Sequence, residues 1–324
     1  MEPYVIEMMK TARKPYEKVG TQEGDKVLII ADTRTDPIIW EVFGATARSL
    51  GAQPVIALML ASPRDYADPP TPVIKAAEES DILHYVTSRG LVHSRFGRKM
   101  SQAKKKRIIS EGIYPRMLLE GAALANPEDI LANVKKITPL WDQGESVRVT
   151  SPKGTDFTVS IKGHYSFATA GAELFKAPTA QFPGGEAPCT PAEDSGDGVI
   201  VVDKAIHYPE GPLAHPIRLT VKKGRLVEIE GDYEAEEFRR WLESWGDDNG
   251  WLLAELSIGT NPLAKFWGSM RQDRFVLGSF HVGFGMNADV GGTIESNIHY
   301  DAIISSPTVS VDGKVIVERG RLTI

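Results

Sequence analysis

The sequence predicts a mixed α/β protein of two domains: an N-terminal α/β domain on a doubly wound parallel sheet, then an α+β domain with mostly antiparallel strands. The length of 324 residues fits two domains. Up to about residue 145, short apolar runs alternate with helical patterns. Beyond that point apolar and polar residues alternate within the runs, which favours antiparallel strands. We therefore expect a scaffold domain over residues 1–145 and a second domain over residues 146–324.

The first domain begins with continuous apolar runs, which are typical of strands buried on both faces of a parallel sheet. The predicted strands are 26–31, 54–58, 81–86 and 107–109, and a helix is expected over 38–50. A nucleotide cofactor does not fit this sheet, because the turn over 32–37 contains no glycine that would let a pyrophosphate approach the backbone.

The second domain opens with a predicted hairpin, in which two alternating strands flank a Pro-Lys-Gly turn. A last hairpin is expected around Asp312-Gly313, a strong turn sequence. A helix is expected over 233–245. The predicted strands are 147–150, 156–161, 198–202, 217–221, 226–229 and the two arms of 309–317.

The composition favours a cytoplasmic protein that acts on a small molecule. A net charge of -6 argues against nucleic acid and anionic membrane as partners, because both are negatively charged. The only cysteine, Cys189, allows no intrachain disulfide, which fits a reducing compartment. Neither a signal peptide nor an apolar run of about 20 residues is evident.

The clearest functional pattern is a pair, His299 and Asp301, two residues apart in an apolar run. Alternate residues of a strand point to the same face, so the imidazole and the carboxylate should project together. Such a pair suits a divalent metal. His281 lies upstream in a second apolar, glycine-framed run. Each histidine also has an ordinary interpretation, as a residue hydrogen-bonded within the core.

Two glutamates belong to the same pattern. Glu186 closes a Pro-Gly-Gly turn, and Glu255 sits inside a mostly apolar strand where an unpaired carboxylate is costly to bury. Either glutamate could instead face solvent, from a turn or from an edge strand. Two histidines and three carboxylates together form a mixed nitrogen and oxygen set that suits zinc, cobalt, manganese or iron.

Several segments resemble the aminopeptidase T/S family of metallopeptidases, in particular its leucyl aminopeptidase-like branch. The similar segments are Phe-Pro-Gly-Gly-Glu (182–186), Ala-Glu-Leu-Ser-Ile-Gly-Thr-Asn-Pro (254–262), Gly-Ser-Phe-His-Val-Gly-Phe-Gly (278–285) and Asn-Ile-His-Tyr-Asp (297–301). The resemblance implies a centre of two metal ions. Its implied ligands are Glu186, Glu255, His281, His299 and Asp301. One departure is Val276, which stands where these peptidases have a further glutamate and which would reduce the centre to one strong site, or to one strong and one weak site.

The same region is similar to 2,5-dihydroxypyridine 5,6-dioxygenase, a non-haem Fe(II) enzyme. The similarity rests on the His299 and Asp301 pair and on the Asn-Pro at 261–262. It implies a histidine ligand where this chain has Glu255. His281 could supply the second histidine that such iron sites require.

From this ligand set the first prediction is a metal-dependent hydrolase that cleaves an amide or peptide bond in a small substrate. A metal-activated water would attack the carbonyl, with Glu186 and Glu255 as the catalytic carboxylates. The alternative is an Fe(II) ring-cleaving dioxygenase of a hydroxylated pyridine, and a third possibility is a catalytically silent binding protein. Asn297 and His93 are expected to contact substrate. The family resemblance also implies a homo-oligomer.

Overall fold

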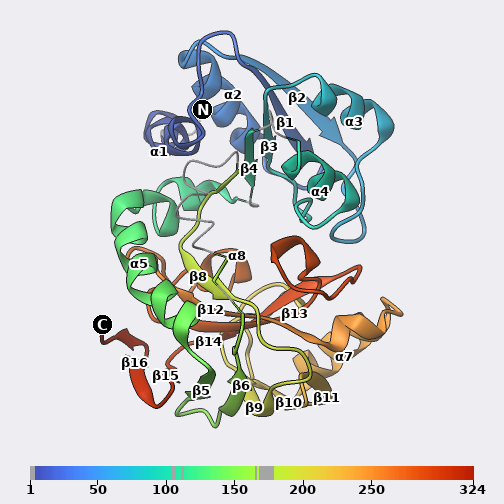
Figure 1. Ribbon diagram of the computed structural model, residues 1–324. Helices are drawn as coiled ribbons and strands as arrows, with labels where there is room; N and C mark the ends of the chain where they lie inside the picture. Colours follow the sequence, from blue (N-terminus) through green and yellow to red (C-terminus); the bar gives the residue numbers. More distant parts are fainter. Residues whose placement is uncertain (1–3, 104–106, 111–112, 165, 168–178) are drawn as a thin grey trace. The chain divides into compact units, whose positions relative to one another are not determined.

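The computed structural model of the chain contains two compact units (Figure 1). The first unit comprises residues 1–124 and 171–184, and the second comprises residues 125–170 and 185–324. Each unit has sheets of its own. The residues that the structure describes are 4–103, 107–110, 113–164, 166–167 and 179–324.

The first unit is built on a five-stranded parallel sheet with the strand order β2-β1-β3-β4-β7. Its strands are β1 (Lys26–Asp32), β2 (Gln53–Met59), β3 (Ile82–Tyr85), β4 (Arg107–Ser110) and β7 (Thr179–Gln181). The central strands β1 and β3 are apolar along almost their whole length, because both of their faces are covered.

Helices cover both faces of this sheet. Leu28 and Ile30 of β1 share one core with helices α3 and α4, whereas Ile29 points to the other face, toward Gly44 of α2. The helices are α1 (Val5–Lys18), α2 (Pro37–Ser49), α3 (Thr71–Glu78) and α4 (Arg95–Ser101). The predicted doubly wound parallel sheet is therefore confirmed.

The second unit contains a large antiparallel sheet with the order β11-β10-β9-β6-β5-β15-β16-β17. Its strands are β5 (Ser146–Thr150), β6 (Asp156–Ser160), β9 (Asp197–Val202), β10 (Ile217–Lys222), β11 (Arg225–Glu230), β15 (Thr308–Val311), β16 (Lys314–Glu318) and β17 (Arg321–Leu322). The β15–β16 hairpin turns at Asp312 and Gly313, whose φ angles of 48° and 81° suit a type I′ turn.

A smaller antiparallel sheet of the second unit, sheet C, has the order β14-β13-β12-β8. Its strands are β8 (Glu186–Cys189), β12 (Leu253–Gly259), β13 (Phe280–Gly285) and β14 (His299–Ile304). One face of sheet C shares a single buried core with the large sheet and with helices α5 (Pro127–Gln143) and α7 (Tyr233–Glu243). The indole of Trp141 on α5 donates a 3.0 Å hydrogen bond to the carbonyl of Ala187 on β8.

The α+β character of the second unit is confirmed, with antiparallel strands throughout both of its sheets. Helix α5, which precedes residue 145, packs in this unit because Ile137 and Trp141 enter its core. Strand β7 follows later in the chain, yet it pairs with β4 of the first unit. Among the described residues, no helix has both the length and the apolarity needed to cross a bilayer.

A buried histidine in the first unit gives a pH-dependent prediction. His84 is 1% exposed, its Nδ1 lies 3.1 Å from the hydroxyl of Tyr16, and its ring packs edge-on against Phe43. Burial lowers the pKa of His84 from 6.5 to about 3. The unfolded chain takes up this proton below pH 6.5 and the folded chain does not. Acid therefore favours unfolding, by about 1.4 kcal/mol for each pH unit below 6.5.

We expect this loss of stability between pH 6.5 and pH 3 to be specific to the imidazole. Denaturant unfolding at pH 7.5, 6.5, 5.5 and 4.5 should show it as a difference between the wild type and His84→Gln. The difference in unfolding free energy should be constant above pH 6.5. Below pH 6.5 the wild type should lose stability relative to the variant with each further drop in pH. Parallel stability curves over the whole range would contradict a neutral, buried His84.

Candidate metal centre

Sheet C has one apolar face and one polar face, because alternate residues of a strand point to opposite sides. Leu256, Val282 and Tyr300 belong to the apolar face and enter the core of the second unit. The strands place the five predicted ligands on the opposite face. These are Glu186 on β8, Glu255 on β12, His281 on β13, and His299 and Asp301 on β14.

Strand register brings these side chains together across the sheet. Glu255 of β12 pairs with Gly283 of β13, which in turn pairs with Asp301 of β14. Gly283 leaves open the space between its neighbours: a Cβ there would lie 2.8 Å from Cβ of Glu255 and 3.1 Å from Nε2 of His299. The absence of a side chain at Gly283 therefore lets Glu255 and His299 approach each other over β13.

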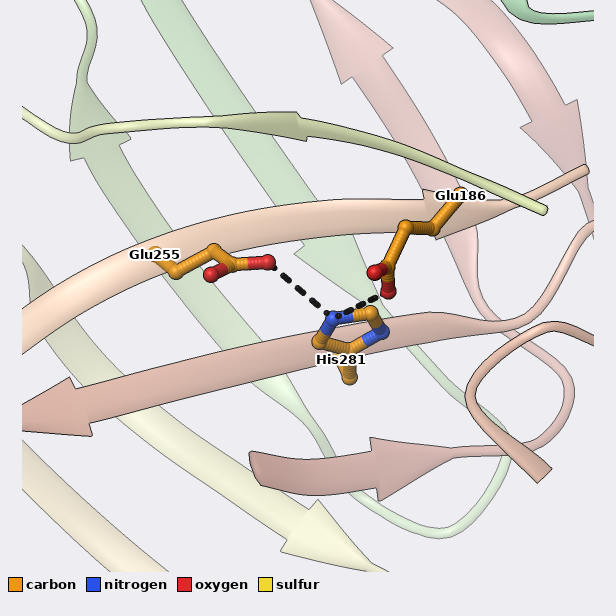
Figure 2. A group of neighbouring side chains, drawn as sticks. All are labelled: Glu186, Glu255 and His281. Atoms are coloured by element: carbon orange, nitrogen blue, oxygen red, sulfur yellow. Dashed lines mark hydrogen bonds and ion pairs between the residues drawn. The ribbon is translucent and has the colours of Figure 1, made fainter. Parts of the chain in front are cut away.

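Three side chains form the tightest group in the cluster. One donor atom each from Glu186, Glu255 and His281 lies within 4.8 Å of the other two. Nε2 of His281 is 3.3 Å from Oε1 of Glu255 and 3.4 Å from Oε2 of Glu186. Figure 2 shows the imidazole between the two carboxylates.

The remaining pair joins this group through Glu255. Nε2 of His299 lies 3.6 Å from Oε2 of Glu255 and 3.2 Å from Oδ1 of Asp301. Glu255 therefore directs one oxygen to each imidazole and links the two histidines. One carboxylate between two imidazoles is the donor set of two-histidine, one-carboxylate metal sites.

Hydrogen bonding fixes which nitrogen of His299 is available to a metal. Its Nδ1 lies 2.7 Å from the carbonyl oxygen of Met286, which can only accept, so Nδ1 must carry a proton. The other nitrogen, Nε2, faces the carboxylates. A backbone carbonyl that orients the imidazole in this way is typical of metal-binding histidines.

Without a metal, protons balance the charge of this cluster. Burial alone would lower the pKa of His299, but its hydrogen bond to Asp301 and the nearby carboxylates outweigh burial and raise the pKa to about 9. The pKa of His281 is raised for the same reason, with Glu255 as its partner. Burial opposes ionisation of Asp301, yet His299, His281 and Arg274 hold its pKa well below the usual range.

The residues present fit a divalent metal. Each imidazole Nε2 points at carboxylate oxygens, a position that only a shared proton or a cation can stabilise. All of the donors are nitrogen or oxygen, and four of the five residues are at most 8% exposed. A cation in their midst would offset the cost of burying the carboxylates.

A match to a family model extends over residues 7–324 and carries the description 2,5-dihydroxypyridine 5,6-dioxygenase. The chain belongs to this family. A relative with the same name, from Pseudomonas putida KT2440, is 25% identical over 258 residues, which are 76% of this chain and 72% of that protein. The predicted resemblance to the dioxygenase is thereby confirmed.

Two solved structures share the fold. The structure of the 2,5-dihydroxypyridine dioxygenase from Pseudomonas putida KT2440 aligns with a TM-score of 0.78 at 21% identity, over 98% of this chain and 96% of that chain. AmpT from Thermus thermophilus aligns with a TM-score of 0.68 at 15% identity, over 99% of this chain and all of that chain. The resemblance to the aminopeptidase T family therefore holds at the level of the fold.

The first functional prediction, a metal-dependent hydrolase, is wrong, because the dioxygenase family matches nearly the whole chain. The roles of Glu186 and Glu255 in water activation rested on the ligand types and on the resemblance to the aminopeptidase T/S family, neither of which determines the reaction. Val276, where the peptidases have a glutamate, pairs through its backbone with Asn261 and brings no carboxylate to the cluster.

Neither of the two residues predicted to contact substrate is among the five residues that sheet C brings together. Asn297 precedes β14 and is exposed, and its backbone N–H donates to Asp247. Because β14 begins only at His299, the alternation of the strand does not extend to Asn297. His93 belongs to the first unit, where its ring packs edge-on against Tyr66. Contact of either residue with substrate stays a prediction.

Sequence reasoning missed Arg274, which follows the short helix α8 (Met270–Asp273). Its Nη1 donates to Oδ2 of Asp301 at 3.0 Å, and its Nε lies 3.8 Å from Oε2 of Glu186. One signal could have revealed it. Three carboxylates exceed the charge of one divalent ion by one, so a buried cluster of this kind requires one further cation.

Proposed function

We propose that this chain is a metal-dependent dioxygenase that opens the ring of a dihydroxylated pyridine, with 2,5-dihydroxypyridine as the first candidate substrate. The observation that carries the proposal is the family match over residues 7–324. The polar cluster of sheet C supports it, because two imidazoles and a linking carboxylate suit a non-haem ferrous ion.

Glu255, His281, His299 and Asp301 are the proposed ligands of one iron per chain. A bound ferrous ion would supply the one-electron chemistry that lets dioxygen react with a closed-shell aromatic ring, while the ring itself is the net electron donor. The protein holds the donors at fixed positions, because all four residues lie on adjacent strands of one sheet. A dry, rigid donor set of this kind needs little reorganisation during the reaction.

Glu186 is the proposed proton acceptor for a ring hydroxyl. Burial raises the pKa of Glu186, an effect that Arg274 and His281 oppose and that Glu255 and Asp301 reinforce. A carboxylate with a raised pKa is a stronger base than an exposed one. Glu186 stands at the start of β8, on the edge strand of sheet C, at the margin of the cluster.

Oxygen uptake tests this proposal. Protein purified without oxygen and loaded with Fe(II) should consume one dioxygen for each 2,5-dihydroxypyridine, and the absorbance of the aromatic ring should disappear at the same rate. Zinc-loaded protein should consume none. Folded, iron-loaded protein that consumes no oxygen with any dihydroxypyridine isomer would refute the proposal.

Metal removal provides a second prediction. Because a metal binds the folded cluster and not the unfolded chain, loading should raise the melting temperature, and a chelator should reverse the rise. At a free metal concentration 100 times Kd the stabilisation is about 2.7 kcal/mol. An unchanged melting temperature in calorimetry, with and without metal, would instead favour the silent binding protein.

A further inference from the structure

Arg274 occupies an unusual place beside the proposed ligands. Its guanidinium forms ion pairs with the carboxylates of Asp301 and Glu186, and its Cζ atom lies 4.8 Å from the centre of the Phe275 ring. The arginine side chain is 13% exposed, and that of Asp301 is 2% exposed. An arginine keeps its charge under all ordinary conditions, so this positive charge is a permanent part of the site.

The contact with Asp301 separates the two oxygens of that carboxylate. Arg274 holds Oδ2 at 3.0 Å, whereas Oδ1 faces Nε2 of His299 at 3.2 Å. The guanidinium therefore occupies Oδ2, whereas Oδ1 lies beside the histidine that is proposed to bind metal. Arg274 would therefore orient Asp301 so that Oδ1 is the oxygen available to a metal.

The charges of the site then balance for one type of ion. Among the described residues of the cluster, Glu186, Glu255 and Asp301 carry three negative charges and Arg274 offsets one of them. A divalent ion would offset the other two when both imidazoles are neutral. A trivalent ion would leave one positive charge in excess. In a buried site such an excess is costly, because the effective dielectric constant is far below that of water.

We propose that Arg274 is a positioning residue that sets the preference of this site for a divalent over a trivalent ion, and thereby keeps bound iron ferrous. The statement that Arg274 keeps iron ferrous rests on the proposed function, since the dioxygenase reaction requires Fe(II). The preference for a divalent over a trivalent ion should hold for any metal that the cluster binds.

A merely structural ion pair makes a different prediction. If Arg274 only held the loop after α8 in place, its loss would lower the binding affinities for divalent and for trivalent ions by the same factor. If its charge matters, its loss leaves the site one charge more negative, and trivalent ions gain relative to divalent ones. The ratio of the two affinities therefore separates the two roles.

The test is the reduction potential of the iron-loaded protein, measured by redox titration with the ferric signal in electron paramagnetic resonance as readout. In Arg274→Gln and Arg274→Met the affinity for Fe(III) relative to Fe(II) should rise at least tenfold, which lowers the potential by about 59 mV for one electron. Arg274→Met keeps an aliphatic side chain to pack against Phe275, so at least one of the two neutral variants should fold. Arg274→Lys keeps the positive charge, so its ratio of Fe(III) to Fe(II) affinity should stay within threefold of the wild-type ratio.

Arg148→Gln is the matched control, because it removes an arginine from a 3.2 Å surface ion pair with Asp156 on the large sheet. Its potential should equal that of the wild type. Unchanged potentials in both neutral variants, or an equal shift in Arg274→Lys, would overturn the proposal.

Competition between Zn(II) and Ga(III), which requires neither iron nor turnover, tests the charge preference independently. The Ga(III) to Zn(II) affinity ratio should rise at least tenfold in the neutral variants. This result would sustain the charge preference even if the protein cleaved no dihydroxypyridine. An unchanged ratio would refute the charge preference even in an active dioxygenase.

Discussion

Glu255→Ala should lose stoichiometric metal binding, with an affinity weaker by roughly 100-fold or more, since even the partners of ligands contribute 10–100-fold. The reason is its central place: its two oxygens lie 3.3 Å from His281 and 3.6 Å from His299. No other carboxylate contacts both imidazoles among the ion pairs of the described residues. Without Glu255 the two histidines have no shared counter-charge, and oxygen uptake should become undetectable.

The fold should survive this substitution, because Glu255 faces away from the apolar side of sheet C, where Leu256 enters the core. Metal content by mass spectrometry and affinity by chelator competition would measure the effect, with circular dichroism to verify folding. Glu236→Ala, on the solvent side of α7, is the matched control and should bind metal like the wild type. A folded Glu255→Ala protein with an affinity within threefold of the wild type would exclude Glu255 as a ligand.

Three of the four strands that carry the cluster, β12, β13 and β14, could be predicted because their apolar patterns are strong, whereas Glu186 on β8 was expected in a turn. His299 and Asp301 share a face through the two-residue period of a strand, and this required no knowledge of the fold. The packing of helix α5 in the second unit could not be predicted from a local sequence pattern. It depends on Trp141 reaching the carbonyl of Ala187, a contact between residues 46 positions apart.

Arg274 and Gly283 lay beyond sequence reasoning for a related reason. Arg274 acts through Asp301, 27 residues later, from the end of a four-residue helix that has no marked periodicity. The importance of Gly283 depends on the register of β12, β13 and β14, which no local pattern fixes.

The choice between hydrolase and dioxygenase failed because ligand types do not determine a reaction. Imidazole and carboxylate donors hold zinc, manganese, cobalt and iron alike. This chain also shares its fold with both AmpT and the Pseudomonas putida dioxygenase, and one fold can support unrelated chemistry. The family match over residues 7–324, together with the relative of the same name, distinguished the two.

Gly283→Ala should disable the metal centre although it replaces none of the proposed ligands. The added methyl group would lie 2.8 Å from Cβ of Glu255, closer than real Cβ atoms approach other atoms, and a tight 3.0 Å from Cε1 of His299. Either β12 and β14 must move apart or the two side chains must turn away. We expect metal affinity to fall at least tenfold and stability to fall by about 1–3 kcal/mol, as overpacking of a filled interior commonly costs.

Gly44→Ala separates this steric effect from the general effect of replacing a glycine. Gly44 lies inside helix α2, where a new Cβ would meet Ile56 and Ile29 at ordinary distances of 3.6 and 3.8 Å. Alanine favours a helix over glycine by roughly 1 kcal/mol, so this variant should gain stability and bind metal normally. Denaturant unfolding and chelator titration of both variants would measure the contrast. If Gly283→Ala also bound metal normally, Glu255 and His299 would not need their close approach over β13, and the proposed ligand geometry would be wrong.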